Sequence, residues 1–168
     1  LDLVGPQGAI FGFLGRNGAG KTTTIRLVTG LARPDAGRAW INGIEMTDGD
    51  DRGRRQFGYL PQEPAFYGWM TSTGYLDHIG RLFGMPAVER RERVTDLLRL
   101  VDLESAANRR VGGFSGGMKQ RLGLAGALIH RPPVLILDEP MAGLDPAGRR
   151  DVLDLMEALR AEVTIFFS

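Results

Sequence analysis

The chain has 168 residues, of which 43% are hydrophobic and 24% charged, and its formal net charge at pH 7 is +1. This length and apolar content suit one folded domain and exclude a largely disordered chain. The near-neutral charge disfavours a nucleic-acid partner, because proteins that bind nucleic acids usually carry a basic surface. The absence of cysteine excludes disulfides and thiolate chemistry. No apolar run approaches the roughly 18 residues that a membrane-spanning helix needs.

The hydrophobic pattern predicts alternating strands and helices, as in α/β proteins. Short apolar runs predict strands at residues 9–14, 38–41, 57–60, 134–137 and 163–167. Helical spacing of apolar residues predicts helices at about 21–30, within 71–101, after Ser115 and after Asp145. The pair Asn42-Gly43 favours a turn after the second strand. Because the run at 134–137 has no polar alternation, we expect a mostly parallel sheet flanked by helices. The helical pattern within 71–101 predicts a helical insertion in the middle of the chain.

A glycine-rich loop separates the first predicted strand from the first predicted helix. The pattern Gly15-x-x-x-x-Gly20-Lys21-Thr22 has the spacing of a phosphate-binding loop, whose backbone N–H groups surround a phosphate at the positive end of a helix. Lys21 would contact the β- and γ-phosphates, and the Thr22 hydroxyl would ligate Mg²⁺. The alternative, a glycine-rich turn before an ordinary helix, is disfavoured by the flanking strand and helix. The candidate nucleotide-binding residues are Gly15, Asn17, Gly18, Ala19, Gly20, Lys21, Thr22 and Thr23.

Two carboxylates follow the most apolar predicted strand. Asp138 and Glu139 come directly after residues 134–137, at the end of the strand that faces the ligand crevice in open α/β sheets. Asp138 would bind Mg²⁺ directly or through water, and Glu139 would orient and polarise an attacking water. The alternative is a solvated turn that ends at Pro140. The phosphate-loop pattern upstream favours the catalytic interpretation.

A second glycine pair precedes the predicted helix after Ser115. Ser115 is a candidate N-cap, and Gly116 and Gly117 beside a helix N-terminus can form an anion-binding nest. One nucleotide site leaves no obvious use for a second phosphate nest within the same chain. This nest is therefore predicted to serve the nucleotide of a partner copy, and the alternative is a helix start with a flexible glycine entry.

These motifs, in this order, resemble those of the ATP-binding subunit of ABC transporters, and the resemblance covers essentially the whole chain. It also includes Gln62 and the segments 115–122, 137–140 and 143–145. The sequences of residues 17–24 and 115–118 are most similar to those of bacterial exporter-type subunits. The resemblance implies a single ABC-type ATP-binding domain over 1–168, with a P-loop NTPase core at about 1–62 and 115–168 and a helical subdomain at about 63–114.

The resemblance also implies an activity. The chain would be a motor subunit that binds and hydrolyses ATP with Mg²⁺, in a head-to-tail homodimer or heterodimer that encloses two ATP molecules. Gln62 would sense Mg²⁺ and the attacking water, which makes it a candidate catalytic and metal-site residue. Asp145 would reach across the dimer interface, although capping of the following helix is a sufficient alternative role.

The resemblance further implies a separate transmembrane permease, on which residues 63–114 would dock at the cytoplasmic face of the cell membrane. Phe66, Tyr67 and Trp69 could form an aromatic docking groove, and core packing explains them equally well. The family's adenine-stacking aromatic residue and its histidine after the last strand fall outside residues 1–168. We therefore expect a fragment that is truncated at both ends.

Two other functions remain open at this point. The first is a soluble ABC-type ATPase that acts on ribosomes or DNA, although the segment between Thr22 and Ser115 is too short for the long insertions of the DNA-acting members. The second is a regulatory module that binds nucleotide without hydrolysing it, which the presence of Glu139 disfavours. The outer residues of the signature, Phe114 and Met118, depart from the family's common Leu-Ser-Gly-Gly-Gln, and Met118 cannot make the hydrogen bonds of a glutamine.

Overall fold

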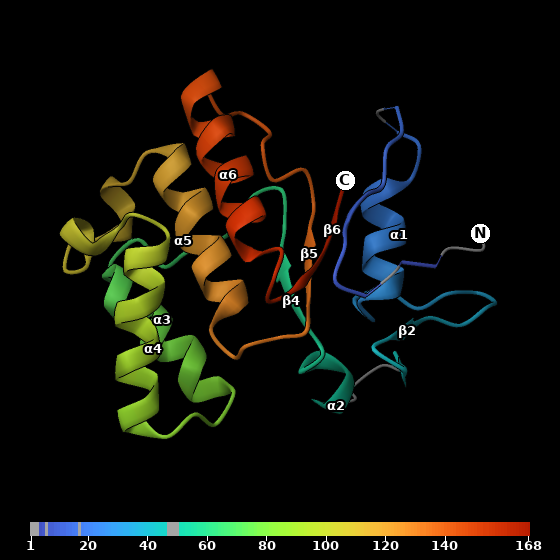
Figure 1. Ribbon diagram of the computed structural model, residues 1–168, viewed down its shortest axis with the longest axis horizontal. Helices are drawn as coiled ribbons and strands as arrows, with labels where there is room; N and C mark the ends of the chain where they lie inside the picture. The colour runs from blue at the N-terminus through green and yellow to red at the C-terminus, as the bar shows by residue number, and fades with distance from the viewer. Residues whose placement is uncertain (1–3, 6, 17, 47–50) are drawn as a thin grey trace.

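The computed structural model describes residues 4–5, 7–16, 18–46 and 51–168. Its strands are β1 (Ile10–Gly12), β2 (Trp40–Ile41), β3 (Ile44–Glu45), β4 (Phe57–Leu60), β5 (Val134–Leu137) and β6 (Thr164–Phe167). Its α-helices are α1 (Lys21–Val28), α2 (Asp51–Arg54), α3 (Ser72–Leu82), α4 (Ala87–Leu100), α5 (Gly116–Leu128) and α6 (Pro146–Leu159), with 3₁₀ helices at Glu104–Ala106 and Val111–Gly113. Helices lie on both sides of a central sheet (Figure 1), which confirms the predicted α/β class.

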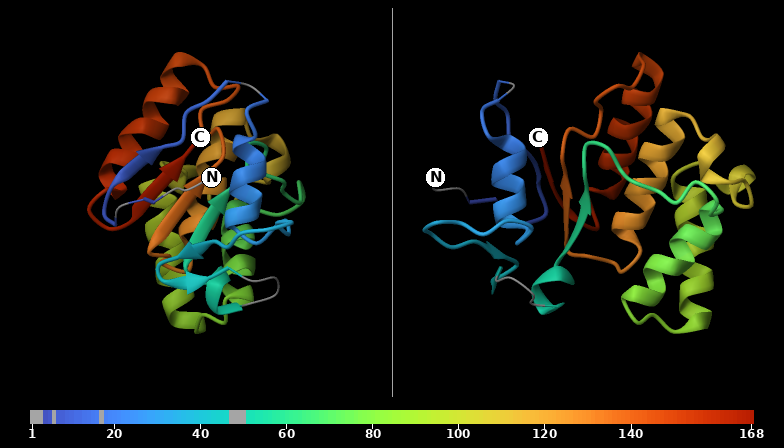
Figure 2. Two further views of the ribbon diagram at one scale, coloured as in Figure 1. Left: turned by 90° about the vertical axis from the view of Figure 1, so that its right-hand side faces the viewer. Right: turned by 180° about the vertical axis from the view of Figure 1, so that it is seen from behind.

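The central sheet has four parallel strands in the order β1-β6-β5-β4. The left view of Figure 2 shows these strands side by side. Leu137, the last residue of β5, is level with Leu60 on one neighbour and with Phe167 on the other. Because parallel strands end at the same edge of a sheet, the loops that follow all four strands meet there.

A small antiparallel hairpin of β2 and β3 lies apart from this sheet. Its turn is Asn42-Gly43, as predicted, and both residues have positive φ angles of 49° and 75°. A two-residue hairpin turn with these angles matches the twist of the flanking strands, which explains the asparagine and glycine. The sequence did not predict β3 or the short helix α2. The predicted strands at 9–14 and 38–41 are shorter in the structure, at Ile10–Gly12 and Trp40–Ile41.

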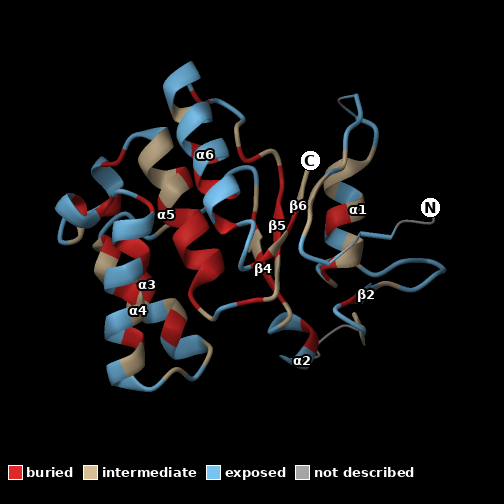
Figure 3. Ribbon diagram, in the orientation of Figure 1, coloured by how far each residue is buried: buried red, intermediate tan, exposed pale blue. Residues whose placement is uncertain are grey.

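Side chains divide the interior into two hydrophobic clusters on opposite faces of the sheet. The larger cluster lies between the sheet and helices α3 to α6, and the smaller one joins Ile25 of α1 and Ile41 of β2 to Phe57 of β4 and Ile136 of β5. Strand β5 contributes to both, because Leu135 and Leu137 enter the larger cluster and Ile136 the smaller one. Figure 3 shows β5 and α5 as the most continuously buried elements. Burial on both faces is what the apolar run at 134–137 predicts.

Close packing of α5 against β4 requires a glycine. A Cβ atom on Gly58 of β4 would lie 2.0 Å from the carbonyl oxygen of Ala127, at the end of α5. The helix backbone therefore rests directly on the strand, which fixes α5 relative to the sheet. The start of α5 is fixed by its cap, since the Ser115 hydroxyl accepts a hydrogen bond from the Met118 amide.

The segment 63–114 contains α3, α4 and the two 3₁₀ helices, and none of the named strands. Its helical region is interrupted at Gly84, whose φ of +73° follows the end of α3, and Pro86 is the N-cap of α4. The boundaries of a separate helical subdomain at about 63 and 114 stay a prediction. Among the described residues, no helix combines the length and apolar character needed to cross a membrane.

His130 lies where the end of α5, β4 and the end of α3 meet. Its ring stacks on Phe83 with a centroid distance of 3.8 Å, and its Nε2 lies 3.1 Å from the carbonyl oxygen of Phe57. Burial lowers the pKa of His130 to about 4, and the charges of Arg55 and Arg93 lower it too, against the opposing effect of the Phe57 hydrogen bond. The neutral ring, with Nε2–H donating to Phe57, is therefore the form that the fold stabilises.

The lowered pKa of His130 should make the free energy of unfolding depend on pH. An unfolded histidine has a pKa near 6.5, so the contribution of His130 is complete above about pH 6.5 and is lost as the pH falls toward 4. His130→Gln keeps a donor for Phe57 but cannot titrate, so its urea-unfolding free energy should fall less between about pH 7 and pH 5 than that of the unchanged chain. His78→Gln, on the exposed surface of α3, is the matched control. An unchanged pH dependence in His130→Gln would contradict the prediction.

Candidate functional site

The predicted site residues converge at the carboxyl edge of the parallel sheet. The glycine-rich loop follows β1, Gln62 follows β4, and Asp138 and Glu139 follow β5. Ser168 follows β6, the strand between β1 and β5. The strand order thus places four short segments, distant in sequence, beside one another.

The glycine-rich loop adopts a backbone that side chains rarely permit. Gly18 and Gly20 have φ angles of 80° and 86°, in the left-handed region that favours glycine. Gly20 is the N-cap of α1 and supplies no side-chain hydrogen bond, so the first amide groups of the helix are open to an external acceptor. Ala19 is exposed, and Thr23 is exposed on the first turn of α1. Asn17 lies outside the described residues.

Lys21 connects the loop to the acidic end of β5. Its Nζ donates a hydrogen bond to the carbonyl oxygen of Gly15 at 3.1 Å and lies 3.5 Å from Glu139 Oε1. The Lys21 side chain is 11% exposed and that of Glu139 is 32% exposed, so the ion pair is partly shielded from water. Shielding strengthens such a pair relative to one on the open surface.

Gln62 contacts the same carboxylate from the other side. Its Nε2 donates a hydrogen bond to Glu139 Oε2 at 3.1 Å. The two oxygens of Glu139 therefore have different partners, Lys21 on Oε1 and Gln62 on Oε2. Glu139 also has a positive φ of 46°, which is uncommon for a residue with a Cβ atom and marks a constrained backbone.

Asp138 lies deeper, with 1% of its surface exposed. Its Oδ1 accepts hydrogen bonds from the Thr22 hydroxyl at 3.2 Å and from the Ser168 hydroxyl at 2.9 Å. Buried carboxylates require such donors, because an unpaired charge in the interior is costly. The sequence predicted that Thr22 and Asp138 act on one metal ion, and the structure brings them within hydrogen-bonding distance.

The donor set fits Mg²⁺. Thr22 and Asp138 offer hard oxygen atoms, and Mg²⁺ is usually held by one or two protein oxygens together with waters and phosphate oxygens. No group of three or more histidine, aspartate or glutamate side chains that could hold a metal occurs in the described part of the chain.

Sequence reasoning missed Ser168. Its hydroxyl contacts both acidic residues, since it donates to Asp138 Oδ1 and accepts from the Glu139 amide at 3.1 Å. The sequence feature that could have identified Ser168 is its position directly after the predicted strand 163–167, which could lie beside residues 134–137.

The signature residues Ser115, Gly116 and Gly117 do not join the site residues at the carboxyl edge of the sheet. Ser115 and Gly116 are exposed at the start of α5, and a Cβ atom on Gly116 or Gly117 would meet no atom within 4 Å. Helices α5 and α1 lie on opposite faces of the sheet (Figure 1). Asp145 caps α6 by accepting a hydrogen bond from the Gly148 amide at 2.8 Å. Both motifs thus form open helix starts on the surface.

The three aromatic residues after Gln62 have different environments. Phe66 packs against the larger hydrophobic cluster and meets the Tyr75 ring edge-on at a centroid distance of 4.8 Å. Tyr67 and Trp69 are 63% and 68% exposed, and their rings lie 5.9 Å apart. Core packing therefore accounts for Phe66, whereas Tyr67 and Trp69 form an exposed aromatic pair that core packing does not explain.

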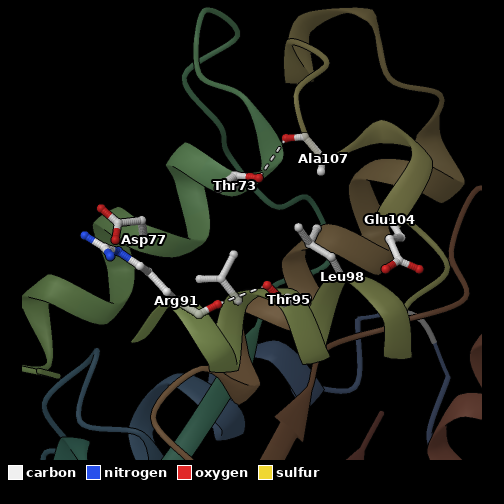
Figure 4. Close-up of a pocket in the computed structure, with 8 residues that line it drawn as sticks. Thr73, Asp77, Arg91, Thr95, Leu98, Glu104 and Ala107 are labelled. Atoms are coloured by element: carbon white, nitrogen blue, oxygen red, sulfur yellow. Dashed lines mark hydrogen bonds between the residues drawn. The ribbon is translucent and has the colours of Figure 1, made fainter. Parts of the chain in front are cut away.

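A groove of about 380 Å³ lies between α3, α4 and the first 3₁₀ helix. Figure 4 shows its lining side chains, with Asp77 and Arg91 on one side of Leu98 and Glu104 on the other. The lining residues are Thr73, Asp77, Arg91, Val94, Thr95, Leu98, Glu104 and Ala107. The groove lies within the segment 63–114. It shares no residue with the acidic cluster, by which we mean Asp138 and Glu139 with their partners Lys21, Thr22, Gln62 and Ser168.

Comparisons with known proteins agree on one family. The family model described as ABC transporter matches residues 1–142. An uncharacterized ABC transporter ATP-binding protein, YxlF of Bacillus subtilis, is 50% identical over 155 residues, which cover 92% of this chain and 51% of that protein. The bacitracin transport ATP-binding protein BcrA of Bacillus licheniformis is 42% identical over 100% of this chain and 55% of its own length. The chain thus spans about half the length of the curated relatives it matches.

Two solved structures share the fold over 99% of this chain. The first, an ATP-binding subunit of an ABC transporter, has a TM-score of 0.85 and 36% identity, with 70% of that chain covered. The second, the dimeric post-hydrolysis state of the ATP-binding cassette MJ0796 with ADP and Pi, has a TM-score of 0.84 and 26% identity, with 77% covered. The sequence and the fold together show that the chain belongs to the ABC transporter family and is homologous to its ATP-binding subunits.

Proposed function

We propose that the protein containing this chain binds and hydrolyses MgATP and that it is the motor subunit of a transporter. One observation carries the proposal: the Glu139 carboxylate lies between Lys21 Nζ and Gln62 Nε2, beside a left-handed glycine loop at a helix start. A cation, an anion-binding backbone and a carboxylate with a positioned amide are the groups that phosphoryl transfer to water requires.

The glycine loop and Lys21 bind the phosphates. The amide groups at the start of α1 donate hydrogen bonds to phosphate oxygens, with Gly18 and Gly20 supplying the required backbone conformation. Lys21 Nζ, which lies 3.5 Å from Glu139 Oε1, turns to the phosphates and exchanges one anionic partner for another. This exchange leaves the Glu139 carboxylate available for chemistry.

Thr22 and Asp138 would hold the metal ion. The Thr22 hydroxyl would be a direct ligand, and Asp138 would bind directly or through a water. When bound, Mg²⁺ would neutralise the charge that develops on the phosphate oxygens.

Glu139 and Gln62 act on the attacking water. Glu139 accepts a proton from the water as a general base, and Gln62 orients the carboxylate through its hydrogen bond to Oε2. Gln62 lies in the loop that leads from β4 to the helical segment, so a change at the nucleotide can be transmitted to residues 63–114.

A second copy or a related subunit completes each site. The start of α5, with Ser115, Gly116 and Gly117, is an anion-binding surface that lies apart from the described residues of the nucleotide site in its own chain, so we assign it to the partner's ATP. Asp145, exposed at the start of α6, contributes to the same head-to-tail interface besides its capping role. The similarity of this chain to the ATP-binding cassette MJ0796, whose solved structure is dimeric, supports this arrangement.

A transmembrane permease docks on the helical segment at the cytoplasmic face of the membrane. The groove between α3 and α4 has an apolar floor at Val94 and Leu98 and a rim with Asp77, Arg91 and Glu104. We assign it to a short amphipathic loop or helix of the permease, whose apolar side fits the floor and whose charges fit the mixed rim. The likeness to a bacitracin transport protein favours transport over an action on ribosomes or DNA.

Lys21→Ala should weaken ATP binding. A charge-assisted contact of this kind is worth about 1.5 to 3 kcal/mol, or roughly 10- to 150-fold in affinity. Isothermal titration calorimetry measures the change, and Lys119→Ala on α5 is the matched control, because it removes a lysine outside the acidic cluster. Unchanged affinity in Lys21→Ala would overturn the assignment of the phosphate loop.

Glu139→Gln should separate binding from hydrolysis. The variant loses the base but keeps a hydrogen-bonding amide, so phosphate release should fall by roughly 100-fold or more. ATP binding should persist or tighten, because Lys21 no longer has a competing carboxylate partner. Phosphate-release and ATP-binding assays on the same preparation measure both quantities, with Glu63→Gln in the exposed loop as the control. Hydrolysis at the unchanged rate would mean that another group is the base.

Ser115→Arg should abolish ATP-dependent dimerisation. The arginine fills a surface where the structure leaves space, so ATP binding to one subunit persists while the partner's phosphates are excluded. Light scattering with a non-hydrolysable ATP analogue and Mg²⁺ measures dimer formation, and hydrolysis should be lost with it. A normal dimer of this variant would remove Ser115 from the interface.

Thr95→Trp should block docking on the permease. Thr95 is exposed on α4 and lines the groove, so the indole occupies the space assigned to the permease. Sedimentation with membranes that contain the co-expressed permease should fall about tenfold or more, the effect of losing a well-packed contact of roughly 1.4 kcal/mol. Glu92→Trp, exposed on α4 but outside the groove lining, is the control. Equal sedimentation of both variants would place docking elsewhere.

A further inference from the structure

Ser168 occupies the position next to the acidic pair because of the register of β6. Phe167 is level with Leu137, and the Ser168 amide donates a hydrogen bond to the Leu137 carbonyl oxygen at 3.0 Å. This last backbone contact holds Ser168 beside the point where β5 ends. Its side chain therefore reaches the two residues that follow Leu137.

The Ser168 hydroxyl uses both of its hydrogen-bonding capacities there. It donates to Asp138 Oδ1 at 2.9 Å and accepts from the Glu139 amide at 3.1 Å. A hydroxyl has one hydrogen to donate and lone pairs to accept, so the two bonds are compatible. One side chain thus bridges the proposed metal-binding residue and the proposed base.

The bond to Asp138 orients a buried charge. Asp138 is 1% exposed, and Oδ1 accepts from both Ser168 and Thr22. Two donors on one oxygen restrict rotation of the carboxylate. Groups that orient a metal-binding side chain in this way affect metal affinity without contacting the metal themselves.

The bond to Glu139 supports an unfavourable backbone. Glu139 has a φ of 46°, a conformation that residues with a Cβ atom rarely adopt. Its amide donates to Ser168 and its carbonyl oxygen accepts from the Ala142 amide at 3.0 Å. These contacts hold the turn in the conformation that directs the Glu139 side chain toward Lys21 and Gln62.

We infer that Ser168 is a positioning residue, which fixes the carboxylate of Asp138 for Mg²⁺ and the backbone of Glu139 for water activation. The inference rests on the proposed function, because it assigns Ser168 to the same site. It adds a fourth strand, β6, to the strands β1, β4 and β5 whose following residues form the site.

The test uses the full-length protein with Ser168→Ala, Ser168→Thr and Thr164→Val. Thr164 lies on the same strand, and its hydroxyl accepts from the Gly8 amide at 2.8 Å, so Thr164→Val removes a comparable hydrogen bond away from the acidic pair. Electron paramagnetic resonance measures Mn²⁺ binding with a non-hydrolysable ATP analogue. Fluorescence of a labelled ATP in EDTA measures nucleotide binding without metal.

Ser168→Ala should weaken Mn²⁺ binding by about 10- to 100-fold, as expected when the support of a metal ligand is lost. Its nucleotide affinity in EDTA should stay unchanged, since Lys21 and the glycine loop are untouched. Ser168→Thr should retain Mn²⁺ binding because it keeps the hydroxyl, and Thr164→Val should resemble the unchanged protein.

Two results would overturn the inference. The first is Mn²⁺ binding in Ser168→Ala equal to that of the unchanged protein. The second is an equal loss of nucleotide binding with and without metal, which would indicate a structural role only. If the unchanged protein itself failed to bind ATP, the proposed function would fail, and that outcome is separate from both results.

Discussion

The parallel register of β5 with its two neighbours is the constraint on which the site depends. Leu137 is level with Leu60 and Phe167, so all three strands end together and their next residues share one edge. Gly58 permits α5 to rest on β4, and burial of β5 on both faces keeps the strand in place. A shift of one residue would move the Asp138 carboxylate to the opposite face and separate it from Thr22.

Charge at this edge is balanced by contacts between motifs. Lys21 lies between backbone carbonyl groups and Glu139, while Thr22 and Ser168 donate to the buried Asp138. The same contacts allow a change of partners, because phosphate oxygens can replace the Glu139 carboxylate at Lys21. The Gln62 contact with Glu139 links this exchange to the helical segment, where the groove between α3 and α4 offers a docking surface.

Local sequence patterns predicted most strands, most helices, the glycine loop and the acidic pair, because each of these depends on residues near one another in the chain. The short strand β3 and helix α2 carry too few apolar residues to give a periodic signal. Ser168 was missed because its role depends on which strands are neighbours, and a single sequence does not reveal strand order. Asp145 could be predicted as a helix cap, whereas a role in a dimer interface depends on a second chain.

The most direct test of the account is a crystal structure of the full-length protein with a non-hydrolysable ATP analogue and Mg²⁺. In that structure Lys21 Nζ should have left Glu139 and should lie within hydrogen-bonding distance of a phosphate oxygen, with the metal ion beside Thr22 and Asp138. A nucleotide bound elsewhere, or one bound with the Lys21–Glu139 ion pair intact, would contradict the account.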